Sequence, residues 1–164
     1  MFKLITMQQN GQLDPTDFRI LEILQQDARM DATHIGLAVH KSEAATRKRL
    51  VKLREQGYIR KFAALLDRNL LGRPTLMIAL VKLNGHSSAA LRTFAESMAA
   101  HPEVQVCLHL SGEYDFMLQV TLRNPAEYED FLEAKLCSLP MVDKVHSSLV
   151  LKEHKMEPAI PLDR

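Results

Sequence analysis

The sequence has few of the features that mark exported or membrane-bound proteins. Among its 164 residues only Cys107 and Cys137 are cysteines, so no disulfide framework is expected and both thiols are predicted to be free and buried. No stretch reaches the roughly 18 uncharged apolar residues that a membrane helix requires. Residues 1–12 lack the long apolar core and cleavage site of a secretory signal. We therefore expect a cytoplasmic protein without a membrane partner.

Catalytic and metal-binding patterns are also missing. The sequence contains no glycine-rich phosphate loop, no G-x-S-x-G motif and no recognisable triad of Ser, His and Asp. Its seven histidines show no ligand spacing and belong to no Cys/His cluster, so we interpret them as surface or packed residues rather than metal ligands. The sequence thus predicts a protein that is not an enzyme and that holds no metal or cofactor.

The net charge of +1 hides an uneven distribution. Residues 1–66 carry 11 basic and 7 acidic side chains, a balance of +4, whereas the remainder carries 10 and 13, a balance of −3. Between Lys41 and Lys61 there are 8 basic side chains and 2 acidic ones. Such a concentration suits a polyanionic partner, and the asymmetry indicates two domains.

Three helices are predicted before residue 57. Asp14 is a good N-cap with Pro15 at the first helical position, Asp31 caps a short second helix to about residue 39, and Ser42 caps a third that ends at Gly57. In the third helix, the spacing of Thr46, Leu50 and Leu53 places them on one buried side. The residues expected to point the opposite way are Ala44, Lys48, Val51 and Lys52.

A short helix with a basic outer side can enter a major groove. Residues 58–66 then read as a short strand or wing with two further cations, so we predict a winged helix-turn-helix domain over residues 13–66. The alternative is a merely solvated charged face. Arg49 is expected either to contact a phosphate or to form a structural ion pair. The other candidate contacts to double-stranded DNA are Ser42, Glu43, Ala44, Arg47, Lys48, Lys52, Arg54, Arg60 and Lys61.

The second half has another rhythm. Residues 67–74 are rich in polar, Gly and Pro residues and are predicted to be a linker. Hydropathy then predicts strands over 76–83, 104–110, 114–122 and 142–152 and helices over 87–100 and 125–138. This βαββαβ order is the ferredoxin-like arrangement, in which two helices cover one face of an antiparallel sheet. We predict an α+β protein whose second domain, residues 75–155, leaves one sheet face free for a homodimer.

Several strings also resemble those of one family. The opening Leu13-Asp14-Pro15-Thr16-Asp17-Phe18-Arg19-Ile20-Leu21, the Glu55-Gln56-Gly57-Tyr58-Ile59 element, the Ser111-Gly112-Glu113-Tyr114-Asp115 loop and the closing Leu139-Pro140-Met141-Val142 occur in the order seen in Lrp/AsnC transcriptional regulators. The chain departs from the family at His40-Lys41, usually Gly-Leu, and at Ala44, often Ser or Thr. Both departures lie where an operator would be read.

The resemblance implies a role for the loop that the residues alone do not. On sequence alone it is a hairpin turn; in similar proteins it binds a free amino acid at a subunit junction, within a RAM-type domain. Candidate effector-binding residues are then Ser111, Gly112, Glu113, Tyr114 and Asp115, with Ser148 and Val150 shaping the side-chain pocket. Asp115 is the candidate partner of the ligand ammonium, with Glu113 as a weaker one.

Together these features predict a sequence-specific DNA-binding regulator whose DNA binding or assembly responds to a small amino acid. The resemblance implies a homodimer that can gather into an octamer. The alternative is an amino-acid-binding regulatory subunit whose helical half contacts proteins rather than DNA.

Overall fold

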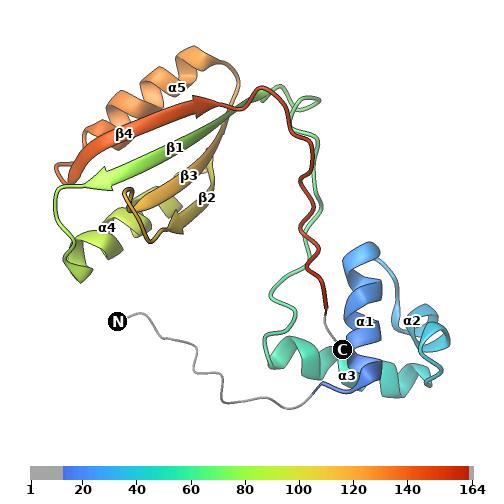
Figure 1. Cartoon of the computed structure of the whole chain (residues 1–164). Coiled ribbons are helices and arrows are strands. Elements are labelled where there is room, and N and C mark those ends of the chain that lie inside the picture. The colour runs from blue at the N-terminus through green and yellow to red at the C-terminus, as the bar shows by residue number, and fades with distance from the viewer. Residues whose placement is uncertain (1–12, 163–164) are drawn as a thin grey trace. The chain divides into compact units, whose positions relative to one another are not determined.

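The computed structural model describes residues 13–162. Residues 1–12, in which no secretory signal is expected, lie outside this range. The chain divides into two compact units (Figure 1). One extends to Ala64 and also includes the segment from Lys155, and the other is Leu65–His154. Each unit has a core of its own, so each is described separately.

The first unit is built on the three predicted helices, α1 (Pro15–Gln26), α2 (Ala32–Ala38) and α3 (Glu43–Glu55). Each begins at its predicted N-cap, since the side chains of Asp14, Asp31 and Ser42 accept backbone N–H groups of the first turn. Their buried sides meet in a small apolar core. Its buried members are Ile20, Ile23, Ile35, Val39 and Leu53.

The close approach of α2 to the start of α3 requires a residue without a side chain within α2, at Gly36. A Cβ on Gly36 would lie 2.8 Å from the carbonyl oxygen of Lys41 and 3.1 Å from Oγ1 of Thr46. The backbone N–H of Lys41 also donates to the Gly36 carbonyl at 2.9 Å. This close approach fixes where α3 starts relative to α2.

The strand predicted over residues 58–66 is wrong. These residues have no regular secondary structure, and Phe62, Leu65 and Leu66 are exposed. A strand needs a hydrogen-bonding neighbour, and the sheet of the described chain consists of four strands that all belong to the second unit. The cations of this segment therefore lie on extended chain rather than on a β-ribbon.

The second unit confirms the βαββαβ order. Its strands are β1 (Thr75–Leu83), β2 (Val104–His109), β3 (Phe116–Leu122) and β4 (Val142–Leu149), and its helices are α4 (Ser88–Ala99) and α5 (Pro125–Phe131). The sheet is antiparallel in the order β2-β3-β1-β4. Alternate residues of β1, namely Met77, Ala79, Val81 and Leu83, pack with both helices in the larger core.

Two ends of elements differ most from those predicted, while the others differ by at most two residues. The helix predicted over residues 125–138 is α-helical only to Phe131, as α5, and continues as a π-helical segment, η1 (Leu132–Cys137). The last strand, β4, ends at Leu149 rather than at residue 152, and one further backbone bond, from the N–H of Val150 to the Leu76 carbonyl, follows its end. Both cysteines are free, but neither is fully buried as expected, since Cys107 is partly buried and Cys137 is exposed.

The end of the chain returns to the first unit. The side-chain amide of Gln25, at the end of α1, donates to the carbonyl of Ile160 at 3.1 Å and accepts the N–H of Ile160 at 2.7 Å. A glutamine amide has one donor side and one acceptor, which is the pair that a neighbouring peptide group would present. The segment from Lys155 is thereby attached to α1.

Candidate nucleic-acid interface and effector loop

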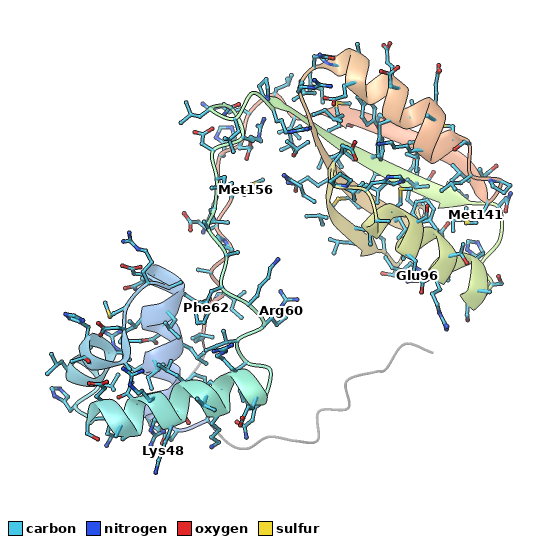
Figure 2. All side chains as sticks on the ribbon, turned by 180° about the vertical axis from the view of Figure 1, so that it is seen from behind. Lys48, Arg60, Phe62, Glu96, Met141 and Met156 are labelled. Atoms are coloured by element: carbon cyan, nitrogen blue, oxygen red, sulfur yellow. The ribbon has the colours of Figure 1, made fainter. Side chains whose placement is uncertain are left out.

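Helix α3 has a buried side and a charged outer side. Thr46 and Leu53 are almost fully buried, and the Thr46 hydroxyl donates to the Ser42 carbonyl at 3.0 Å. The predicted outward residues Ala44, Lys48, Val51 and Lys52 are all exposed. Figure 2 shows Lys48 projecting from α3 away from the other helices of its unit. The helix therefore presents cations at a spacing of four residues on a surface free of core contacts.

The N-terminal end of α3 is held by its own cap. Ser42 Oγ accepts the N–H of Ala45 at 3.3 Å, and this leaves its hydroxyl proton able to donate elsewhere. In the preceding pair, His40-Lys41, the backbone is strained at His40, whose φ is 55°. Ser42, Glu43 and Ala44 are all exposed. They form a helix start of the kind that accepts anions.

Arg49 forms the structural ion pair, one of its two expected uses. Its Nη1 lies 2.6 Å from Oδ2 of Asp14 and 2.7 Å from Oδ1 of Asp17, which is 2% exposed. These hydrogen bonds, that to Asp17 first, raise the pKa of Arg49 above its ordinary value. Burial raises the pKa of Asp14, but the N–H of Asp17 and the Arg49 guanidinium together outweigh it and lower that pKa. Arg49 thus joins α3 to the start of α1.

A second ion pair lies on the outer side of the same helix. Arg47 donates from Nε to Oε1 of Glu43 at 2.8 Å, and its Nη2 lies 2.7 Å from the same oxygen. Thr33 of α2 donates to the other oxygen, Oε2, at 2.9 Å. The Arg47 bond, followed by the Thr33 bond, holds the pKa of Glu43 below its ordinary value. Unlike the Arg49 pair, this one is solvent-exposed.

The remaining candidate cations lie towards the end of α3 and beyond it. Arg54, Arg60 and Lys61 are exposed. Arg54 and Arg60 line a shallow open hollow together with Val51, Glu55 and Ile59. Figure 2 labels Arg60 and Phe62 on the extended chain that follows α3. The loss of the predicted strand leaves these cations on the first unit, close to the end of the helix.

The loop predicted to bind an effector, Ser111–Asp115, joins β2 to β3. Ser111, Gly112 and Glu113 are exposed, and Gly112 has a φ of 141°, in the region that favours glycine. Asp115 is buried, and its Oδ2 accepts the N–H of Leu83 at 2.8 Å. Oδ1 of Asp115 lies 3.1 Å from Nδ1 of His86. Asp115 therefore fixes the base of the loop to the end of β1.

Within one chain, two of the predicted effector residues lie away from this loop. Asp115 donates its N–H to Val81, whereas Ser148 is paired with Ile78 and Val150 donates to Leu76, further towards the start of β1. At about 3.4 Å per residue, these positions are roughly 10 and 17 Å from Val81 along the strand. Two residues of β4 contact the loop instead, since Lys144 Nζ lies 5.9 Å and the His146 ring 6.4 Å from the centre of the Tyr114 ring.

Sequence reasoning missed His86, Lys144 and His146 beside the loop and Thr33 beside Glu43. Lys144 and His146 come beside the loop through the order of the strands, because the loop lies directly before β3 and both β3 and β4 pair with β1. No comparable signal exists for His86 or Thr33. Their contacts depend on how separate elements pack.

The described residues contain neither a metal-binding cluster nor a membrane-spanning helix. Among residues 13–162 there is no group of three or more His, Cys, Asp or Glu side chains able to hold a metal ion. No helix in the same range has the length and apolarity needed to cross a membrane.

Comparison with known protein families covers both units. Residues 13–54 match the AsnC-type helix-turn-helix domain, and residues 76–160 match the Lrp/AsnC ligand binding domain. The leucine-responsive regulatory protein of Rhizobium meliloti is 35% identical over 144 residues, 88% of this chain and 92% of that protein. The transcriptional regulator AzlB of Bacillus subtilis is 30% identical over 92% of this chain and 96% of its own length.

Solved structures give the same result. The L-Met complex of a transcriptional regulator from Neisseria meningitidis is 32% identical, with a TM-score of 0.86, and the match covers 92% of this chain and 97% of that one. AsnC of E. coli shares the fold at 19% identity, with a TM-score of 0.81 over 91% of this chain. Both domains, in the same order, are thus found in related chains of nearly the same extent.

Proposed function

Because the chain belongs to the Lrp/AsnC family of DNA-binding transcriptional regulators, we propose that α3 reads an operator in the major groove while the sheet unit binds a free amino acid. The observation that carries the DNA part is the outer side of α3. Lys48 and Lys52 are exposed there, on the side of the helix opposite to Thr46 and Leu53. These cations take no part in the core and are free to meet phosphates.

The proposed contacts divide by position. Ser42 and the N–H groups at the start of α3 meet a phosphate, since a helix N-terminus favours anions. Glu43 and Ala44 lie nearest the base edges, with Arg47 beside them. Lys48 and Lys52 neutralise phosphates along the groove, and Arg54, Arg60 and Lys61 extend this contact along the backbone. Arg49 is left out of the interface, because its guanidinium already binds Asp14 and Asp17.

Salt dependence tests the DNA proposal. Replacing both Arg47 and Lys48 by alanine should weaken binding to an operator selected from random duplexes. Affinity falls as salt rises, and each lost phosphate contact should make the slope of log affinity against log salt less steep by about one unit. The matched control, Arg92→Ala with Lys152→Ala, removes the same charge from exposed positions outside the first unit. An unchanged slope in the first variant would refute the assignment of α3, and no duplex binding by the wild type would favour a protein-contact role.

For the effector, we propose that the loop Ser111–Asp115 binds an α-amino acid. Exposed loop N–H groups suit a carboxylate. Asp115 suits the ammonium, because each of its oxygens has a lone pair beyond those used by Leu83 and His86. The related regulator from Neisseria meningitidis was crystallised with L-Met. Ser148 and Val150 lie beside Ile78 and Leu76 of β1, away from this loop. We therefore propose that they reach an effector site only from a second copy of the chain, in a dimer or an octamer.

A thermal screen of the twenty amino acids tests this site. A ligand at 100 times its dissociation constant should stabilise the protein by about 2.7 kcal/mol. Asp115→Asn keeps an acceptor for the Leu83 N–H but removes the charge, so it should lower ligand affinity about ten- to hundredfold with folding retained. Calorimetry on the folded variant measures this. Wild-type affinity in Asp115→Asn would leave Asp115 with its anchoring role alone.

A further inference from the structure

A carboxylate lies on the most cationic surface of the protein. Glu43 is the first residue of α3 and is exposed together with Lys48 and Lys52. A negative charge at this position opposes any approach of DNA phosphates. It also interacts favourably with the positive end of the helix dipole. That second effect would require no partner for the carboxylate, yet both of its oxygens have one.

The partners form a chain of contacts across two helices. Thr33 of α2 donates to Oε2 of Glu43, and Oε1 accepts from Nε of Arg47 and lies 2.7 Å from its Nη2. An exposed pair between positions i and i+4 of a helix adds little to stability. Its effect on geometry is larger. An arginine side chain has many rotamers, and the contact with a carboxylate restricts them.

The orientation of Arg47 has a specific chemical consequence. Its Nε–H and the neighbouring N–H of Nη2 form the edge that faces Glu43. The other edge, made by Nη1 and Nη2 at the end of the side chain, is not used in these contacts with Glu43, so its N–H groups are able to donate to another acceptor. Two parallel N–H groups at that spacing match O6 and N7 of guanine in the major groove, the commonest base-specific contact of arginine.

We propose that Glu43 is a specificity-determining residue, which positions Arg47 for a guanine and disfavours DNA without one. The inference rests on the proposed function, in which α3 enters the major groove. At a site with guanine, Arg47 binds the base in its preset orientation and offsets the repulsion between Glu43 and phosphates. At any other site the repulsion remains. Thr33 takes part from α2 by fixing the second carboxylate oxygen.

The test compares base discrimination with overall affinity in the full-length protein. An operator is selected from random duplexes with the wild type, and each guanine is then changed to adenine in turn. Dissociation constants are measured for these duplexes and an unrelated one at several salt concentrations. The variants are Glu43→Gln, Arg47→Lys and Thr33→Val. The control is Glu55→Gln, which removes the same charge from an exposed position at the other end of α3.

In Glu43→Gln, we expect discrimination against adenine at one guanine position to fall about fivefold or more, while affinity for the unrelated duplex rises. Arg47→Lys should lose discrimination at the same position, because an ammonium cannot form the two parallel bonds. Thr33→Val should show a smaller loss there. Glu55→Gln should raise general affinity and keep discrimination, which separates orientation from charge alone.

Two results would overturn the inference. The first is unchanged discrimination in Glu43→Gln with operator binding intact, which refutes it alone. The second is an operator in which Arg47→Lys affects no guanine position. Failure of the wild type to bind any duplex would refute the proposed function as well, so the two failures can be told apart.

Discussion

The two units hold their candidate binding groups in different ways. In the first unit, the candidate DNA-contacting cations of α3 are exposed and lie within a few residues of one another on a single helix; they are Arg47, Lys48, Lys52 and Arg54. In the second, the loop Ser111–Asp115 is fixed by Asp115, whose carboxylate contacts the N–H of Leu83 and the ring of His86. One set of groups depends on a helix and its caps. The other depends on contacts between separate segments.

This difference predicts how each binding surface tolerates change. A surface cation on α3 can be removed with little effect on folding, because its side chain contacts solvent rather than the core. A change at Asp115 alters the end of β1 and the base of the loop together. We therefore expect DNA affinity to be adjustable by single substitutions, and the effector loop to respond to substitutions in stability and binding at once.

The largest effects should come from the two cores. Phe94→Ala should cost the sheet unit about 3–5 kcal/mol and Ile20→Ala should cost the trihelical unit about 2–5 kcal/mol, because both side chains are fully buried. Amide hydrogen exchange on the native protein measures each unit separately. Each variant serves as the control for the other. Equal loss of protection in both units would contradict the division into two separately packed cores.

The next largest loss of stability should distinguish Arg49 from Arg47, two arginines of α3. Arg49→Ala should destabilise the first unit by about 3 kcal/mol, since it leaves Asp17, 2% exposed, without its charged partner. Arg47→Ala, the matched control two residues earlier, should cost about 0.3–0.5 kcal/mol. Urea denaturation measures both. Similar midpoints for the two variants would show that the Arg49 contacts contribute no more than a surface pair.

Each unit has one glycine whose replacement by alanine should be destabilising, and the physical reason differs between the two. Gly36→Ala should destabilise the first unit by about 1–3 kcal/mol, because the new Cβ would press on the Lys41 carbonyl. Gly112→Ala meets no atom within 4 Å but must adopt a φ of 141°, and should cost about 1–3 kcal/mol of backbone strain. Only Gly112→Ala should alter amino-acid affinity. Loss of effector binding in Gly36→Ala would argue against separate roles.

The smallest expected effect is a loss of folding stability at low pH, which both units should show. Lys135 leads the influences that lower the pKa of Glu103 in the sheet unit, and the pKa of Asp14 is lowered in the first. Each therefore stabilises folding above its ordinary pKa, about 4, and this contribution is lost as pH falls through the lower pKa of the folded state. Melting temperatures between pH 7 and about 3 measure this. Asp14→Asn and Glu103→Gln should each flatten the profile.

Local signals accounted for most of the fold. The caps at Asp14, Asp31 and Ser42 and the glycine after α3 are short-range features, and they marked the helices correctly. Hydropathy marked the strands, and the order of elements then restricted the topology. The outer side of α3 also followed from periodicity alone. The positions of Lys48 and Lys52 could be predicted because a helix repeats every 3.6 residues.

Contacts between distant segments could not be predicted in this way. The Leu83 bond of Asp115 spans 32 residues and needs the register of the sheet. Pairing of Ser148 with Ile78 likewise sets how far β4 residues lie from the loop. The strand expected over 58–66 failed for a related reason. Its residues suit a strand, but pairing requires a neighbour that the sequence of the segment itself does not reveal.

The bond between Gln25 and Ile160 has a consequence for the order in which the molecule is completed during synthesis. Among residues 13–162, the trihelical core includes none beyond Ile59, so it can form before the sheet unit has been made. Its attached segment emerges about 100 residues later, roughly 5–20 s at ordinary rates of translation. The earliest unit to fold is therefore also the last to be finished, and a fragment that ends at residue 66 lacks this final contact.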